Sequence, residues 1–118
     1  NNISNLELYG TGFPKREFIY SDDVADAVIF LLKNNNNKFL SPINIGSGNE
    51  VTIKKLSKII SNIIGYNGLI KFDDTKPDGA KRKMLDSSII NKMGWKAQIP
   101  LLKGIARTYE WFLENMEE

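Results

Sequence analysis

Residues 9–23 read Tyr-Gly-Thr-Gly-Phe-Pro-Lys-Arg-Glu-Phe-Ile-Tyr-Ser-Asp-Asp, and this stretch decides the predicted fold. Its glycines and proline end a short apolar strand at Leu6–Tyr9, and Glu17–Tyr20 is a second extended run. Ser21 can cap a helix, and the two acids that follow it lie at the positive end of the helix dipole. We therefore predict a strand, a glycine turn, a second strand and a helix in close succession.

The rest of the chain continues this alternation of short strands and helices. Apolar residues at helical spacing predict the helices, and short β-branched or aromatic runs predict the strands. The helices are expected from Ser21 to about Lys33, from Thr52 as cap to Gly65, from Asp86 to Met93 and over Leu101–Asn115; further strands are expected at Ile43–Ile45 and Leu69–Phe72. Short strands that alternate with helices are typical of an α/β fold.

The predicted strand at Ile43–Ile45 has a helix on each side in the sequence. Such a strand usually belongs to a larger parallel sheet, in which both of its faces are covered. The chain offers few other strands to pair with it. We therefore expect a neighbouring sheet segment that these residues do not include.

Composition excludes several classes of function. The 118 residues are 42% hydrophobic and 25% charged, as in an ordinary soluble domain, and no apolar run approaches the roughly 20 residues of a membrane helix. The net charge of +2 is too small to predict nucleic-acid binding. The chain has no Cys and no His, which excludes zinc sites of the usual ligand type and Ser-His or Cys-His catalysis.

The basic residues are unequally divided between lysine and arginine. Thirteen are Lys, whereas only Arg16, Arg82 and Arg107 are Arg. Arginine offers a planar fork of several donors that lysine cannot copy. Arg16 follows a Gly/Pro turn and precedes a strand, so we expect its head to point from a rigid edge into a cleft. Trp95, Trp111 and Phe112 are expected to lie in the core or in helix packing.

Three stretches together carry a resemblance to a known family. They are residues 9–23, Ile43–Gly48 and the charged loop Lys76–Asp86. The first two resemble the C-terminal half of extended short-chain dehydrogenases that act on nucleotide sugars. The Lys-Pro-Asp-Gly loop, with residues 94–95 and 108–115, is similar to the branch that converts GDP-4-keto-6-deoxymannose to GDP-L-fucose with NADP(H).

The resemblance implies what residues 1–118 are and what they lack. They correspond to a C-terminal substrate-binding portion of a Rossmann-type fold, without the N-terminal dinucleotide-binding half. The family's glycine fingerprint, its Tyr-x-x-x-Lys pair and its catalytic Cys and His do not occur here. We therefore expect no catalytic, cofactor-binding or metal-binding residue in this chain, and no activity from it alone. A cytoplasmic enzyme that binds NADP(H) and forms a homodimer mainly through the other half is the implied whole.

The candidate residues are substrate-binding ones. The resemblance places a substrate-contacting Arg at Arg16 and a contact to the nucleotide pyrophosphate at Lys83. Adjacent residues of an extended chain face opposite ways, so only one of Arg82 and Lys83 should face the ligand. Tyr9 stands where the family usually has Trp and is either a substrate contact or a core aromatic. Asp78 could accept from a ribose hydroxyl, but Pro-Asp-Gly favours turn formation on its own.

Two alternatives remain open at this point. The same fold could serve another nucleotide-sugar epimerase or dehydratase, against which the Lys-Pro-Asp-Gly loop argues by resemblance. The chain could also be a non-catalytic nucleotide-sugar binding module, because it lacks the family's catalytic residues. The strand predicted at Ile43–Ile45 argues against a free-standing module, because it calls for a neighbouring sheet.

Overall fold

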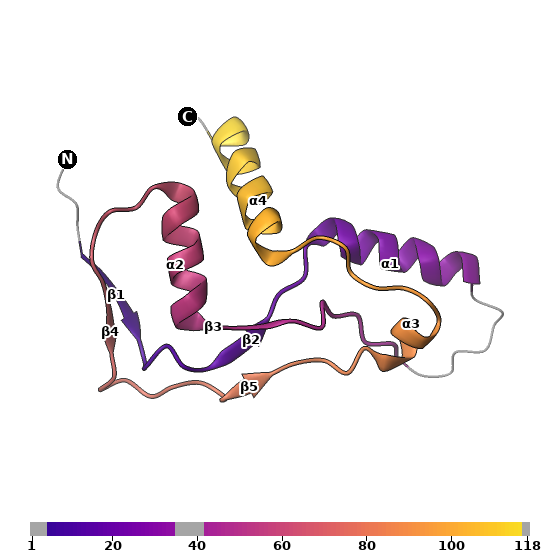
Figure 1. The fold of residues 1–118 in the computed structure, drawn as a ribbon, viewed down its shortest axis with the longest axis horizontal. Helices are drawn as coiled ribbons and strands as arrows, with labels where there is room; N and C mark the ends of the chain where they lie inside the picture. Colours follow the sequence, from indigo (N-terminus) through magenta and orange to yellow (C-terminus); the bar gives the residue numbers. More distant parts are fainter. Residues whose placement is uncertain (1–4, 35–41, 117–118) are drawn as a thin grey trace. The chain divides into compact units, whose positions relative to one another are not determined.

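The computed structural model describes residues 5–34 and 42–116 (Figure 1). Their contacts divide the chain into two compact units that interleave in the sequence. The first unit comprises Asn1–Arg16, Val51–Lys83 and Ile105–Glu118, and the second comprises Glu17–Glu50 and Met84–Gly104. In the described ranges, no helix is long and apolar enough to cross a membrane.

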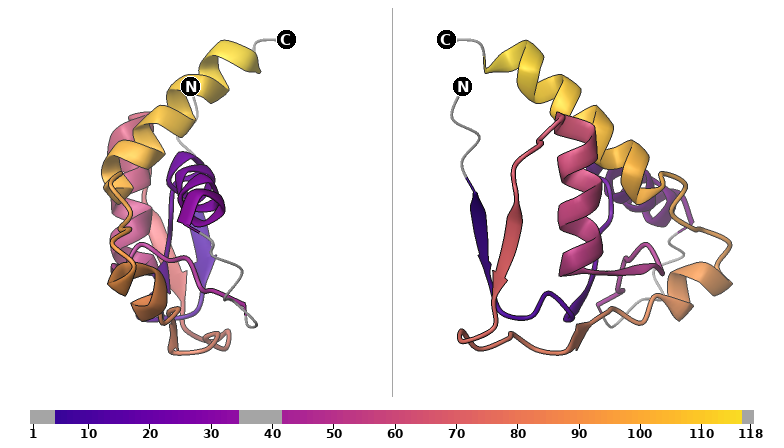
Figure 2. Two further views of the ribbon diagram at one scale, coloured as in Figure 1. Left: turned by 90° about the vertical axis from the view of Figure 1, so that its right-hand side faces the viewer. Right: turned by 60° about the vertical axis from the view of Figure 1, so that its left-hand side comes forward.

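A parallel strand pair joined through a helix forms much of the first unit. Strand β1 (Leu6–Tyr9) pairs with β4 (Ile70–Asp73), and Figure 2 shows the two strands side by side. Helix α2 (Ile53–Ile64) lies on the connection between them, as parallel pairing requires a crossover. Both strands were predicted to within one residue, because a glycine adjoins one end of each apolar run.

Both ends of α2 are as the sequence predicts. The Thr52 side chain accepts a hydrogen bond from the Lys55 amide, as an N-cap should. Gly65 ends the helix with a φ of 70° in the left-handed region, and its amide donates to the Ser61 carbonyl. Residues close in sequence thus predict both ends of α2, and backbone carbonyls of a distant turn bind two further amides at its start.

Three short strands form a second sheet in the order β3-β2-β5. They are β2 (Lys15–Glu17), β3 (Glu50–Thr52) and β5 (Arg82–Lys83). The strand predicted at Glu17–Tyr20 therefore begins earlier and stops at Glu17. The Tyr20 carbonyl accepts from the Val24 amide, which shows that the chain is already entering the next helix.

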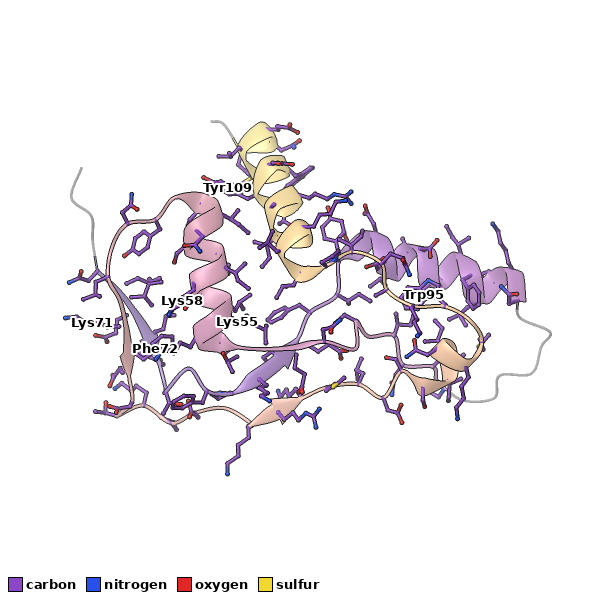
Figure 3. All side chains as sticks on the ribbon, viewed as in Figure 1. Lys55, Lys58, Lys71, Phe72, Trp95 and Tyr109 are labelled. Carbon is purple, nitrogen blue, oxygen red and sulfur yellow. The ribbon has the colours of Figure 1, made fainter. Side chains whose placement is uncertain are left out.

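Helices α1 (Ser21–Asn34) and α3 (Ser88–Lys92) belong to the second unit. Its core gathers Ala27, Ile90 and Trp95, and the last of these is 5% exposed (labelled in Figure 3). The indole Nε1 donates to Asp26 at 2.8 Å. Trp95 is therefore a core residue, as predicted.

Asp23 has a structural role that differs from the predicted one. Its buried carboxylate accepts from the backbone amides of Gln98 at 3.0 Å and Ile99 at 2.9 Å. The acid thus fastens a distant loop to the start of α1. The helical position was visible in the sequence, but the partners lie too far along the chain to be predicted.

The structure assigns no strand to Ile43–Ile45, where one was predicted. Both isoleucines are instead half-buried against the core around Trp95. The apolar run reflects this packing, and the strand that forms nearby is β3, with Val51 buried. That residues 43–45 pair with a sheet from another segment stays a prediction.

Helix α4 (Leu101–Asn115) has the predicted bounds. Its aromatic residues do not have the predicted burial, since Trp111 is 59% and Phe112 49% exposed. Apolar spacing along a helix predicts which residues share a face. It does not say whether another part of the described chain covers that face.

Candidate functional site

The turn at Gly10–Gly12 begins the candidate site, which lies in the first unit. On one side, the carbonyl of Gly12 accepts from the Lys54 amide at 2.9 Å, and that of Pro14 accepts from Ile53 at 3.1 Å. The next amide of α2 is bound by the helix cap. Since the amides at the start of α2 bind protein oxygens, this helix end is not an open anion site.

On its other side, the turn is bonded to Asp78. The Thr11 amide donates to Asp78 Oδ1 at 2.8 Å, and the Thr11 hydroxyl donates to Oδ2 at 2.6 Å. A Cβ at Gly10 would collide with this carboxylate, and the φ of Gly10 is 83°. Asp78 therefore joins two loops through both carboxylate oxygens. The predicted ribose contact stays a prediction.

Gly12 shows the same close packing on β4. A Cβ there would lie 2.5 Å from the Phe72 ring (labelled in Figure 3), and its φ is 76°. Glycine is needed at Gly12 for backbone conformation and for space. The turn is thus held at a fixed place immediately before Lys15 and Arg16.

In the second sheet, the basic residues of the site lie on two different faces. Strands β2 and β5 are parallel, with Arg16 beside Lys83 and Lys15 beside Arg82. Neighbours in a ladder project to the same face, and successive residues project to opposite faces. Arg16 and Lys83 therefore share one face, and Lys15 and Arg82 share the other.

The Arg16 guanidinium is bonded to backbone carbonyls, and its expected position in a substrate cleft stays a prediction. Its Nη1 donates to the Lys15 carbonyl at 2.7 Å and to the Ala80 carbonyl at 2.8 Å. Nη2 lies 3.0 Å from where a Cβ of Gly79 would stand. The side chain lies along the loop because carbonyls there accept from Nη1. These bonds use one of the three nitrogens of the guanidinium.

Tyr9 is an exposed aromatic residue at the end of β1. It is 73% exposed, and Lys76 Nζ lies 5.7 Å from the centroid of its ring. This distance is within the range of a cation–π contact. Tyr9 is therefore not a core residue in the part of the chain that the structure describes, and its predicted substrate contact stays a prediction.

Thr11 and Lys76 were not singled out from the sequence. Thr11 lies within a glycine turn, where a small polar residue is ordinary. Lys76 is one of thirteen lysines, so nothing distinguishes it before the loop is placed over Tyr9. A hint existed in the pairing of a Gly-Thr-Gly turn with a Pro-Asp-Gly loop, since hydroxyl and carboxylate are complementary.

Glu17 was missed as well, and it bears on cofactor binding. Its Oε1 accepts from the Gly48 amide at 2.7 Å, and its Oε2 accepts from the Leu85 amide at 3.0 Å. A Cβ at Gly46 would lie 2.6 Å from Oε1. The Gly46–Gly48 turn is thus filled by a carboxylate and does not fit the phosphates of NADP(H).

The pKa of the Asp86 carboxyl group is lowered in the folded protein. The Ser88 amide donates to Asp86 Oδ1 at 2.9 Å, and this bond lowers the pKa of the carboxyl group. The Ser88 side chain and the charge of Lys92 lower the pKa further. Asp86 was predicted to cap the helix here; it bonds the first amide of α3, although Ser87 is the residue at the N-cap position.

Comparison with known proteins places these residues in a family context. Residues 1–46 match the model of the NAD dependent epimerase/dehydratase family. GDP-L-fucose synthase 1 from Arabidopsis thaliana is 42% identical over 98% of this chain and 35% of its own length. The chain thus spans about a third of the length of the curated relatives it matches.

Solved structures are also similar to most of this chain and are covered over about a third of their own length. A GDP-L-fucose synthetase from Naegleria fowleri bound to NADP has a TM-score of 0.86 and 28% identity, covering 98% of this chain and 36% of that one. A GDP-mannoheptose C4 reductase from Campylobacter jejuni with NADP bound has a TM-score of 0.79 and 38% identity, covering 92% and 35%. The predicted fold class, an α/β portion of a Rossmann-type fold, is confirmed.

These findings confirm the resemblance that the motifs carry. Nearly the whole chain is similar to a segment of GDP-L-fucose synthases that makes up about a third of their length. Residues 1–46 match the NAD dependent epimerase/dehydratase family.

Proposed function

We propose that this chain holds the nucleotide diphosphate of a GDP-sugar in an NADP-dependent epimerase/reductase. The intact protein would convert GDP-4-keto-6-deoxymannose to GDP-L-fucose. The similarity to GDP-L-fucose synthases over 98% of the chain supports the reaction. The pairing of Arg16 with Lys83 supports the role of this segment.

That pairing is the observation on which the proposal rests. Like charges side by side in a sheet repel each other and destabilise it. A diphosphate bound between Arg16 and Lys83 would attract both side chains and so offset their repulsion. Arginine can fork onto two phosphate oxygens, and lysine adds a compact charge on a flexible stem. Releasing one Nη1 bond to a carbonyl would let the guanidinium turn to such a ligand.

The contribution of these residues is binding and orientation. Holding the diphosphate places the sugar at a fixed position, which removes much of the entropic cost of reaction. NADPH, when bound, supplies the hydride that reduces the keto group. The Gly46–Gly48 turn does not fit its phosphates, and residues 1–118 contain no Tyr-x-x-x-Lys pair, so we assign cofactor binding and proton transfer to residues outside this chain. The homodimer expected of the intact protein stays a prediction.

Ligand titration of the intact protein tests the proposal. GDP should bind more tightly than UDP, and guanosine should bind far more weakly than GDP because it lacks the diphosphate. Equal or reversed affinity for GDP and UDP would contradict the GDP assignment. Equal affinity for guanosine and GDP would contradict the diphosphate site.

A different GDP-sugar is the second candidate. The C. jejuni GDP-mannoheptose C4 reductase is 38% identical to this chain, against 28% for the N. fowleri GDP-L-fucose synthetase. Identity to solved structures therefore does not favour a deoxyhexose over a heptose. Incubation of the intact protein with GDP-4-keto-6-deoxymannose and NADPH decides between them, because formation of GDP-L-fucose supports the first candidate.

A further inference from the structure

The turn that joins the end of α2 to the start of β4 contains the sequence Asn67-Gly68 (Figure 1). In this chain, glycine follows Asn or Asp at two places, here and at Asp78-Gly79. At such a pair the backbone nitrogen of the glycine can attack the side-chain carbonyl carbon before it, because glycine has no side chain to block the approach. Both pairs can therefore close a succinimide ring, and their surroundings decide which one does.

Hydrogen bonds hold the chain on both sides of Asn67-Gly68. Before the pair, the Tyr66 amide donates to a carbonyl of α2 at 2.9 Å, and after it the Leu69 carbonyl accepts from the Leu6 amide at 2.9 Å. Among the described residues, neither Asn67 nor Gly68 has a hydrogen-bond partner, and the Asn67 side chain is exposed. The carboxamide and the Gly68 nitrogen are therefore free to approach each other.

The carboxylate of the second pair is held in place. Asp78 accepts from the Thr11 amide and from the Thr11 hydroxyl through its two carboxylate oxygens. Turning the carboxyl carbon toward the Gly79 nitrogen would break these bonds. A carboxylate also repels an incoming electron pair, which a neutral carboxamide does not. The structure therefore favours ring closure at Asn67 over ring closure at Asp78.

We infer that Asn67 is a site of spontaneous deamidation. The Gly68 nitrogen gives up its proton to base and forms a bond to the Asn67 side-chain carbonyl carbon, while the carboxamide nitrogen takes up a proton and leaves as ammonia. Water then opens the succinimide. Cleavage at the side-chain carbonyl gives aspartate, and cleavage at the backbone carbonyl gives isoaspartate. The reaction needs only water and base, and it is independent of the proposed function.

Isoaspartate at this position changes the connection between α2 and β4. The main chain then runs through the side-chain carbon, which lengthens it by one methylene group, and a negative charge appears. The Leu69 carbonyl, two residues after Asn67, holds Leu6 at the start of the β1–β4 ladder. The isoaspartate form should therefore unfold at a lower temperature than the fresh protein.

The test incubates the intact protein at neutral and at mildly alkaline pH and analyses tryptic peptides by mass spectrometry. Trypsin releases Asn67 in the peptide Ile59–Lys71, which also contains Asn62. Asn62 is the internal control, because it lies in α2 and a β-branched residue follows it. Residue 67 should gain the mass difference between an oxygen atom and an N–H group. This gain should be several-fold faster than at residue 62 and faster at alkaline pH.

Two variants and a free peptide test the mechanism. Gly68→Ala should slow the mass gain at residue 67 several-fold because its methyl group hinders the attack, and Asn67→Gln should abolish it because the larger ring closes poorly. An equal rate in Gly68→Ala would overturn the inference. So would a rate at Asn67 no greater than at Asn62, or one far below that of the synthetic peptide Ile59–Lys71. Circular dichroism identifies a variant that fails to fold, and the comparison of Asn67 with Asn62 in the wild type then decides alone.

Thermal unfolding tests the consequence for stability. Asn67→Asp adds the negative charge without lengthening the main chain. Aged protein rich in isoaspartate should melt at a lower temperature than both fresh wild type and freshly prepared Asn67→Asp. Aged protein that melts together with Asn67→Asp would contradict the effect of the added methylene group.

Discussion

Arg16 lies beside Lys83 in the parallel ladder of β2 and β5, and their side chains project to the same face. One residue earlier in each strand, Lys15 lies beside Arg82 on the opposite face. Four neighbouring basic residues are thereby divided into two pairs. The sequence shows that Arg82 and Lys83 face opposite ways, and the register shows which of them accompanies Arg16.

Arg16→Lys should weaken GDP binding by roughly 1–3 kcal/mol, the cost of a lost charged hydrogen bond. Lysine keeps the charge but cannot bind a phosphate with two parallel donors while another nitrogen contacts the Ala80 carbonyl. Isothermal titration of the intact protein measures the difference. Arg107→Lys on α4 is the control. An unchanged affinity of Arg16→Lys for GDP would contradict the proposed phosphate contact of Arg16.

Glu17→Gln should destabilise the folded protein by roughly 1–3 kcal/mol, because a carboxamide can accept through one oxygen only. One of the amides of Gly48 and Leu85 then loses its partner. Urea unfolding measures the change. The Asp22→Asn variant, which alters an exposed acid of α1, provides the comparison; equal stability of the two variants would show that Glu17 is not needed as a double acceptor.

Gly46→Ala and Gly48→Ala should differ in their effect on stability. The new methyl group meets the Glu17 carboxylate at Gly46, whereas at Gly48 nothing lies within 4 Å. Gly48 has a φ of 75°, so alanine there is strained only in its backbone. Thermal unfolding should show a larger loss for Gly46→Ala, and Glu17→Ala should reduce that loss in the double variant. A larger loss for Gly48→Ala would contradict this packing.

Asp86 should contribute to the pH dependence of stability. Its pKa is lowered in the folded state, chiefly by the bond from the Ser88 amide. A lowered folded pKa gives stability above the unfolded pKa of about 3.9, which is lost as pH falls through the folded value. The stability difference between wild type and Asp86→Asn should therefore shrink on acidification. A difference that is constant from about pH 6 to pH 2 would contradict the shift.

The sequence predicts those elements whose signals are local. The Thr52 cap, the Gly65 stop and the bounds of α4 depend on residues close in sequence, and all are confirmed. At Ile43–Ile45 the structure assigns no strand, and both isoleucines pack against the core around Trp95. The predicted pairing of these residues with a sheet segment outside this chain stays a prediction.

The candidate site was predictable in its residue types and not in its contacts. Arg16 and Lys83 stand out by chemistry and resemblance, whereas their pairing depends on a ladder between distant segments. The two bonds from Thr11 to Asp78 and the Glu17 bond to Leu85 also join residues far apart in the sequence. Patterns in a single sequence do not show which distant residues form such pairs.

The most direct test of the diphosphate site compares Lys83→Gln with Arg82→Gln in GDP titrations of the intact protein. Both variants remove one positive charge from adjacent positions, so general electrostatic attraction falls equally. The account predicts that Lys83→Gln weakens GDP binding clearly more than Arg82→Gln does, because Lys83 alone shares the face of Arg16. Equal losses, or a greater loss for Arg82→Gln, would contradict it.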